Sequence, residues 1–149
     1  MAAPNPIEGK TKYFTADEAN RSLPLVRAIV ADIVRQFEVV NLHKQRLVVL
    51  KNRGRRPQGG DAFAEETAQS QVNLEAEEAQ LIAFVEELTR LGVELKGPDG
   101  LCDFPSLRDG REVYLCWRLG EPDVRFWHEV NAGFAGRQAL DPVPDPTTA

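Results

Sequence analysis

The sequence predicts an α+β fold in which a long antiparallel helical hairpin is followed by a small antiparallel sheet of three to four strands. Three observations lead to this class. Apolar residues recur at heptad spacing through the first part of the chain, and the spacing changes to strict alternation after Gly92. Turn signals, above all Asp109-Gly110, then divide the second part into short segments.

The length of 149 residues fits one domain. Proline and polar residues dominate both ends of the chain, which is typical of loosely held tails. We therefore expect tails at 1–12 and 141–149 around a single domain at 13–140, made of the hairpin (15–91) and the sheet (93–140).

Composition excludes several classes of protein. The net charge of -5 and the pI near 5.1 argue against a nucleic-acid partner. No apolar run approaches the ~18 residues of a membrane span, so no membrane partner is expected. The first residues lack the pattern of a secretory signal, and only Cys102 and Cys116 are present. We expect a cytoplasmic protein with reduced thiols and no disulfide.

The first helix has a clear start and an internal proline. Thr15 and Glu18 are spaced as a capping box, in which each side chain bonds the other's backbone N–H. Pro24 follows only nine residues after Thr15 and cannot donate to the carbonyl of residue 20. We expect a kink or break near Ser22-Leu23, with Pro24 opening the main helix.

Two matched helices, at 24–51 and 61–91, are predicted to pair as the hairpin, joined by the basic, glycine-rich loop 51–60. Gly92 and Val93 are placed to close the second helix as a Schellman motif. Two helices cannot enclose a core of their own, so we expect a homo-oligomer, a two-fold dimer, built on their coiled-coil seam. The seam residues are Val26, Val30, Ile33, Phe37, Val40, Leu81, Val85 and Leu88.

The sheet register follows from a two-residue turn at Asp109-Gly110. That turn places Arg108 opposite Arg111 and Asp103 opposite Cys116. A third strand is predicted at 124–128, which gives a sheet of three strands, the smaller of the two expected sizes. One face is apolar and would meet the helices, with Cys102, Phe104, Val113, Leu115 and Trp117. The opposite face carries Asp103, Pro105, Leu107, Glu112, Tyr114 and Cys116.

Several short motifs occur in a fixed order along the chain. They are Tyr13-Phe14-Thr15, Leu23-Pro24, Asp103-Phe104-Pro105, Gly110 to Trp117, Gly120-Glu121, Trp127-His128 and Gly133 to Gln138. With them the chain resembles, over residues 13–140, the bacterial family catalogued as domain of unknown function 2203. The resemblance implies a bacterial origin and carries over no activity and no catalytic residue. The basic loop 51–60 departs from the family pattern.

The polar face of the predicted sheet carries the residues best suited to chemistry. If Arg118 pairs with Val124, then Asp103, Cys116 and His128 share that face, with Glu121 in the adjoining turn. Carboxylate, thiolate and imidazole are zinc ligands, so a divalent metal such as zinc is the cofactor that this set would take. Alternatively, His128 hydrogen-bonds a carboxylate and Cys116 packs as a small apolar group. A one-residue slip of the third strand would remove His128 from the face.

Arginines form a second constellation. Arg108 and Arg111 flank the hairpin turn, and Arg137 lies in a glycine-containing loop. With Tyr114, these residues are candidates for binding an anionic ligand, because a guanidinium grips a carboxylate or phosphate through two hydrogen bonds. Alternatively, Arg137 pairs with Glu112 or Glu129 and the glycines only form tight turns.

Two functional hypotheses follow. The first is a binding or assembly module that oligomerises through its hairpin. The alternative is a metal-dependent hydrolase- or lyase-type enzyme that uses Asp103, Cys116, Glu121 and His128. The pairing register of the third strand separates them, because the enzyme requires His128 and Cys116 on one face.

Overall fold

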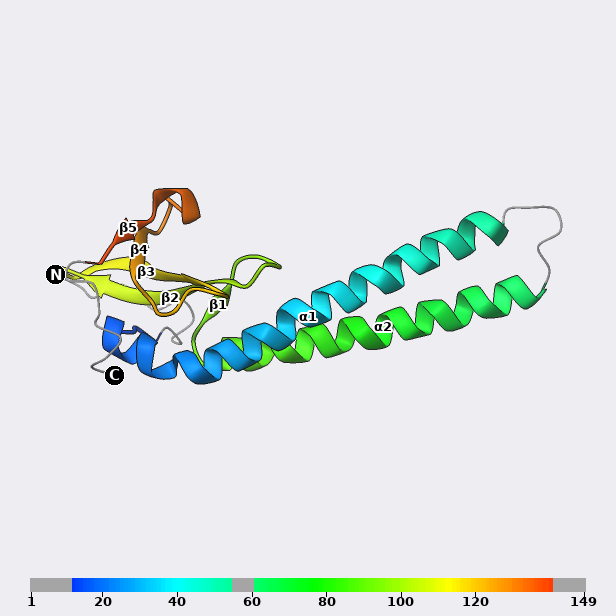
Figure 1. The fold of residues 1–149 in the computed structure, drawn as a ribbon, viewed down its shortest axis with the longest axis horizontal. Coiled ribbons are helices and arrows are strands. Elements are labelled where there is room, and N and C mark those ends of the chain that lie inside the picture. The colour runs from blue at the N-terminus through cyan, green and yellow to red at the C-terminus, as the bar shows by residue number, and fades with distance from the viewer. Residues whose placement is uncertain (1–11, 55–60, 141–149) are drawn as a thin grey trace.

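The structure is a computed structural model that describes residues 12–54 and 61–140. The expected tails and most of the basic loop lie outside the described residues. None of the described helices combines the length and apolar character that crossing a membrane requires. The fold is α+β: a long helical hairpin carries a five-stranded antiparallel sheet near one of its ends (Figure 1).

Helix α1 (Ala16–Gly54) begins at the predicted capping box. The backbone N–H of Thr15 donates to the Glu18 carboxylate at 2.9 Å, and the N–H of Glu18 donates to the Thr15 hydroxyl at 3.1 Å. Of the two predicted outcomes near Ser22-Leu23, a kink or a break, the break is absent, since α1 is continuous and contains Pro24. Figure 1 shows a change of direction in the blue first part of this helix. Burial of the residues around Pro24 keeps the chain helical, because tertiary packing outweighs one missing hydrogen bond.

Helix α2 (Asp61–Arg90) runs back along α1 and ends as predicted. Gly92 has a φ of 90°, and its N–H donates to the carbonyl of Thr89 at 2.9 Å. The N–H of Val93 donates to the carbonyl of Leu88 at 3.4 Å. These two bonds are the Schellman pattern, which turns the chain from α2 toward the sheet.

The sheet is a meander of five strands in the order β1-β2-β3-β4-β5, one more than the largest number predicted. Its two end strands have two residues each and are too short to show an alternating pattern in the sequence. The strands are β1 (Glu94–Leu95), β2 (Leu101–Arg108), β3 (Arg111–Arg118), β4 (Phe126–Glu129) and β5 (Gln138–Ala139).

The predicted register of the central hairpin is confirmed. Arg108 pairs with Arg111, and Asp103 pairs with Cys116. Asp109 and Gly110 have φ values of 54° and 77°, as a type I′ turn requires. The third predicted strand begins two residues later than expected, but Tyr114 pairs with His128 and Cys116 pairs with Phe126 as predicted.

The apolar face of the sheet packs on the base of the hairpin. Phe104 and Trp117 are fully buried in one cluster with Val26 and Val30 of α1. Gly100, with a φ of 90°, allows this close packing. A Cβ atom there would lie 2.7 Å from the Cβ of Leu119 and 3.0 Å from Val30 Cγ1. This arrangement leaves the opposite face of the sheet turned away from the helices.

Most of the predicted helical seam is buried within a single chain, while Phe37, Leu81 and Val85 are only partly buried. Val40, Leu47 and Leu74 form a second apolar cluster between α1 and α2, beyond the sheet. Burial of most of the seam therefore does not by itself require a second copy of the chain. The apolar side chains that remain exposed on the hairpin are Leu25, Leu42, Val48, Val49, Val72 and Ile82.

Candidate metal centre on the polar face of the sheet

Three potential metal ligands meet on the polar face because of the strand register. Asp103 of β2 lies opposite Cys116 of β3, and His128 of β4 lies opposite Tyr114, two residues before Cys116. Their potential ligand atoms all lie within 4.8 Å of one another. All three residues are buried, with exposed fractions of 4% for Asp103, 0% for Cys116 and 2% for His128. The predicted grouping of these three residues is therefore present in the fold.

Both ring nitrogens of His128 are engaged. Its Nδ1 lies 2.7 Å from the carbonyl oxygen of Glu129, and its Nε2 lies 3.0 Å from Oδ1 of Asp103. A carbonyl oxygen only accepts, so Nδ1 must carry a proton. In the neutral ring, Nε2 then presents a lone pair toward a carboxylate oxygen. A cation, either a proton or a metal ion, is needed between these two atoms.

The same contacts argue against a Cys-His-Asp nucleophilic triad. In such a triad one ring nitrogen faces the thiol and the other faces the carboxylate. Here the nitrogens of His128 face Asp103 and a backbone carbonyl, so neither is free to take a proton from Cys116. Burial also raises the pKa of the Cys116 thiol, although the neighbouring Arg137 guanidinium opposes the rise.

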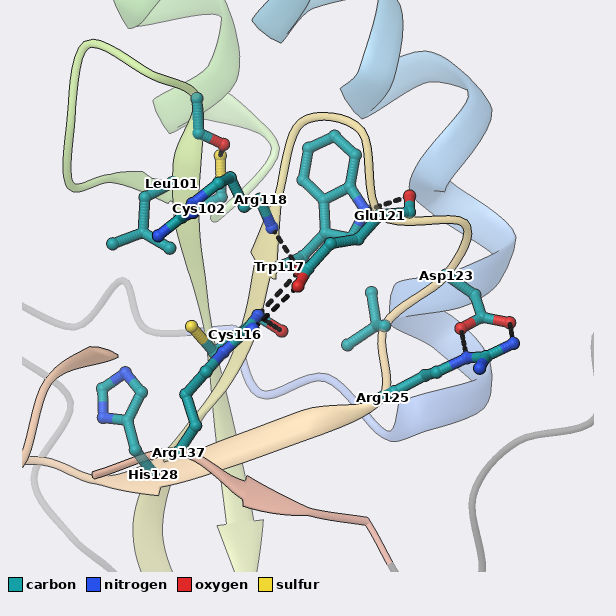
Figure 2. Close-up of polar contacts among 12 residues, drawn as sticks. Leu101, Cys102, Cys116, Trp117, Arg118, Glu121, Asp123, Arg125, His128 and Arg137 are labelled. Atoms are coloured by element: carbon teal, nitrogen blue, oxygen red, sulfur yellow. Dashed lines mark hydrogen bonds and ion pairs between the residues drawn. The ribbon is translucent and has the colours of Figure 1, made fainter. Parts of the chain in front are cut away.

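Arg137 and Glu121 form an ion pair next to the three buried residues (Figure 2). The Nη1 and Nη2 atoms of Arg137 each donate to a carboxylate oxygen of Glu121 at 2.7 Å. The ring centroids of Phe126 and Phe134 lie 4.1 and 4.6 Å from the guanidinium carbon. Arg137 also donates to the carbonyl of Cys116 at 3.3 Å. This pair closes the side of the site next to Cys116.

Glu121 lies outside the three-residue cluster. Besides Arg137, its carboxylate accepts a hydrogen bond from the backbone N–H of Arg118 at 2.7 Å. Burial alone would raise the pKa of Glu121, but these donors outweigh it and lower the pKa. The carboxylate predicted as a ligand is therefore already satisfied by protein donors.

Tyr114 extends the polar face toward β1. Its ring centroid is 5.6 Å from that of His128, and the Lys96 ammonium lies 5.6 Å from the Tyr114 ring. Lys96 also pairs with Glu94 at 2.9 Å. Burial, and next the charge of Glu94, raises the pKa of Tyr114 to about 12, so the phenol stays protonated at neutral pH. It can donate a hydrogen bond beside the site.

The three predicted arginines do not converge. Arg111 donates to the Glu129 carboxylate through Nε at 3.1 Å and Nη2 at 2.7 Å. Arg108 stacks over Trp127, whose ring centroid lies 4.5 Å from the guanidinium carbon. Arg111 shares a face of β3 with Leu115, and Arg108 is its partner on β2, so both arginines lie on the apolar face, where Leu115 pairs with Trp127. Arg137 contacts the opposite face. The alternative of a structural ion pair holds for Arg137, but its partner is Glu121.

Sequence reasoning missed the aromatic cradle of Arg137. The predicted pairing of Arg118 with Val124 implies Phe126 opposite Cys116, and this is the one signal in the sequence for the cradle. The contacts of Phe134 and Arg118 depend on the loop before β5, where no periodic pattern fixes side-chain directions. The Arg118 guanidinium carbon lies 4.2 Å from the Phe134 ring centroid, so Phe134 contacts both Arg118 and Arg137.

These observations define a class of protein: a helical hairpin that carries an antiparallel sheet with a buried carboxylate, thiol and imidazole on its outer face. The model of the family described as "Uncharacterized conserved protein (DUF2203)" matches residues 12–140, and the chain belongs to that family. Neither the comparison with curated proteins nor the comparison with solved structures found a match.

Proposed function

We propose that the protein is a metal-binding module that holds one zinc-type divalent cation between Asp103, Cys116 and His128. The observation that carries this proposal is the close approach of His128 Nε2 and Asp103 Oδ1, at 3.0 Å, with the thiol of Cys116 beside them. A cation must lie between the two atoms, and a metal ion there would also reach the thiol. Zinc bonds of about 2.0–2.3 Å at tetrahedral angles put ligand atoms roughly 3.3–3.7 Å apart. Atoms already within 4.8 Å of one another need only small movements to reach that geometry.

The surroundings of His128 support a metal ligand. Metal-binding histidines usually donate their other ring N–H to a carbonyl or carboxylate, which fixes the tautomer. The bond from His128 Nδ1 to the carbonyl of Glu129 has this form. A bound cation would replace the proton between His128 and Asp103 and the proton of the Cys116 thiol.

Burial favours a binding role over hydrolysis. A catalytic zinc keeps one position open to water and substrate. Here the three ligands are at most 4% exposed, and the pair of Arg137 and Glu121 lies next to Cys116. We therefore infer that the ion stays in place and stabilises the outer face of the sheet. The hydrolase or lyase would require a path to the ion that opens in solution.

Cobalt(II) binding tests the proposal, because a cobalt–thiolate bond adds a charge-transfer absorption band. The metal-free full-length protein should bind one equivalent of cobalt and show this band. Cys116→Ser should lose the band. Cys102→Ser is the matched control: Cys102 is equally buried and lies on the opposite face, so its variant should keep the band.

Two outcomes would contradict the proposal: no cobalt bound by the parent protein, or a band that survives in Cys116→Ser and is lost in Cys102→Ser. If Cys116→Ser fails to fold by circular dichroism, Asp103→Asn provides a second variant of nearly the same shape. Bound zinc at 100 times its dissociation constant should also stabilise the parent protein by about 2.7 kcal/mol.

A further inference from the structure

Arg108 differs from the other arginines of the sheet in having no acceptor for its guanidinium among the described residues. Arg111 donates two hydrogen bonds to the carboxylate of Glu129, and Arg137 donates two to the carboxylate of Glu121. Arg108 is held instead by stacking on Trp127 at 4.5 Å. Stacking on an aromatic face orients a guanidinium and leaves its in-plane N–H groups free to donate.

Arg108 lines a cavity of about 220 Å³. The cavity lies between the start of α1, the ends of β2 and β3 at their shared turn, and β4. This end of the sheet is opposite to the projecting part of the hairpin (Figure 1). Val113, Leu115, Trp127 and Leu140 form the apolar part of the cavity wall, and Arg108 with the hydroxyl-bearing residues Thr15 and Ser106 contributes to a polar part of about equal area.

The size of the cavity limits its ligand. An apolar cavity of about 150 Å³ admits a benzene ring, and drug-sized ligands occupy about 300–1,000 Å³. A volume of about 220 Å³ therefore suits one ring, or a chain of about six carbons, together with a small polar group. A wall that is half apolar, with one guanidinium that has no acceptor among the described residues, suits a molecule that has an apolar body and an anionic end.

We propose that this cavity binds a small organic carboxylate, with the carboxylate held by Arg108 and the apolar body packed against Trp127 and Leu115. The proposal is independent of the metal site, because the cavity is on the other face of the sheet. A carboxylate matches the planar fork of a guanidinium through two parallel hydrogen bonds.

Benzoate and hexanoate are the probes, titrated into the full-length protein with a chelator present so that no metal ion binds the carboxylate. Calorimetry reports binding, and so does the tryptophan fluorescence of the protein, to which Trp127 and the fully buried Trp117 both contribute. At least one probe should bind one to one with a dissociation constant of about 1 mM or below. Benzamide, which has nearly the shape of benzoate without its charge, should bind at least tenfold more weakly.

Arg108→Gln should weaken binding of the carboxylate at least tenfold. Arg111→Gln is the matched control, since it removes the same charge from the paired position and should change binding less than twofold. If Arg108→Gln does not fold, Arg108→Lys keeps the charge, loses the fork and should still bind more weakly than the parent. Absence of binding by both probes, equal binding of benzamide, or undiminished binding by a folded Arg108 variant would each overturn the proposal.

Discussion

The face of the sheet that packs on the hairpin and the face that holds Asp103, Cys116 and His128 are both buried, but different forces stabilise them. The first face buries large apolar side chains, such as Phe104 and Trp117, against α1. The second buries polar groups, each of which needs a partner. Apolar burial tolerates small shifts in geometry, whereas an unpaired buried polar group costs free energy at once. The second face is therefore the better place to look for a metal ion.

The two cysteines show the difference between the two faces at neighbouring positions of β2 and β3. Cys102 and Cys116 lie on neighbouring strands, are fully buried and point to opposite faces. Burial raises the pKa of Cys102 to about 12. Burial raises the pKa of Cys116 too, but the guanidinium of Arg137 opposes the rise. A positive group beside a buried thiol favours the thiolate, which is the form that binds a metal.

The largest expected effect on the free energy of unfolding comes from a substitution on the apolar face. Phe104→Ala should lower the free energy of unfolding by about 3–5 kcal/mol, because it opens a cavity in the core and removes the edge-to-face contact with Phe14. Urea denaturation measures the loss. Leu107→Ala, on the other face of the same strand and 45% exposed, should change stability by less than about 0.5 kcal/mol. Equal losses for the two variants would contradict the assignment of faces.

On the polar face, His128→Ala in the metal-free protein should lower the free energy of unfolding by about 1–3 kcal/mol. The substitution leaves the buried carboxylate of Asp103 without its partner. Asp103→Ala should cost a similar amount, and the double variant should cost less than the sum. Thermal denaturation of all four proteins measures the coupling. Additive losses would mean that the two side chains do not interact.

A smaller, pH-dependent effect is expected at Glu121, whose pKa is lowered in the folded chain despite its burial. Its stabilisation is therefore complete above the pKa of the unfolded carboxyl group, about 4.3, and is lost as the pH falls through the lower folded value. Glu121→Gln should cost about 1 kcal/mol at pH 7. The difference from the parent should shrink below about pH 4. Urea denaturation from pH 7 to pH 3 measures it, and a difference that grows on acidification would refute the assignment.

The reactivity of the two cysteines provides a further test. Both thiols are free in the fold, so titration of the denatured, unreduced protein should find two of them. In the native protein both should react slowly, because both are buried. Glu121→Gln should speed the reaction of Cys116 and leave Cys102 unchanged, since only Cys116 lies under Arg137. Equal acceleration of both thiols would indicate general unfolding instead.

Local rules in the sequence determined much of the fold. The turn at Asp109-Gly110 sets the register of β2 and β3, because a two-residue turn leaves one pairing. Strict alternation along those strands then determines which side chains share a face. The capping box at Thr15 and the closing Gly92 are equally local, and both are confirmed. The grouping of Asp103, Cys116 and His128 follows from these rules once the third strand is in register.

Only the tertiary structure decided the rest, because it depends on contacts between residues far apart in the chain. Packing on the sheet carries α1 through Pro24, where local rules predict a kink or a break. The sheet and the pairing of α1 with α2 bury most of the helical seam within one chain. The choice of Glu121 for Arg137 depends on the path of a turn that no periodicity encodes. Glu129 for Arg111 and Trp127 for Arg108 depend on how β4 packs beside β3. Long side chains have several partners within reach, and the fold selects among them.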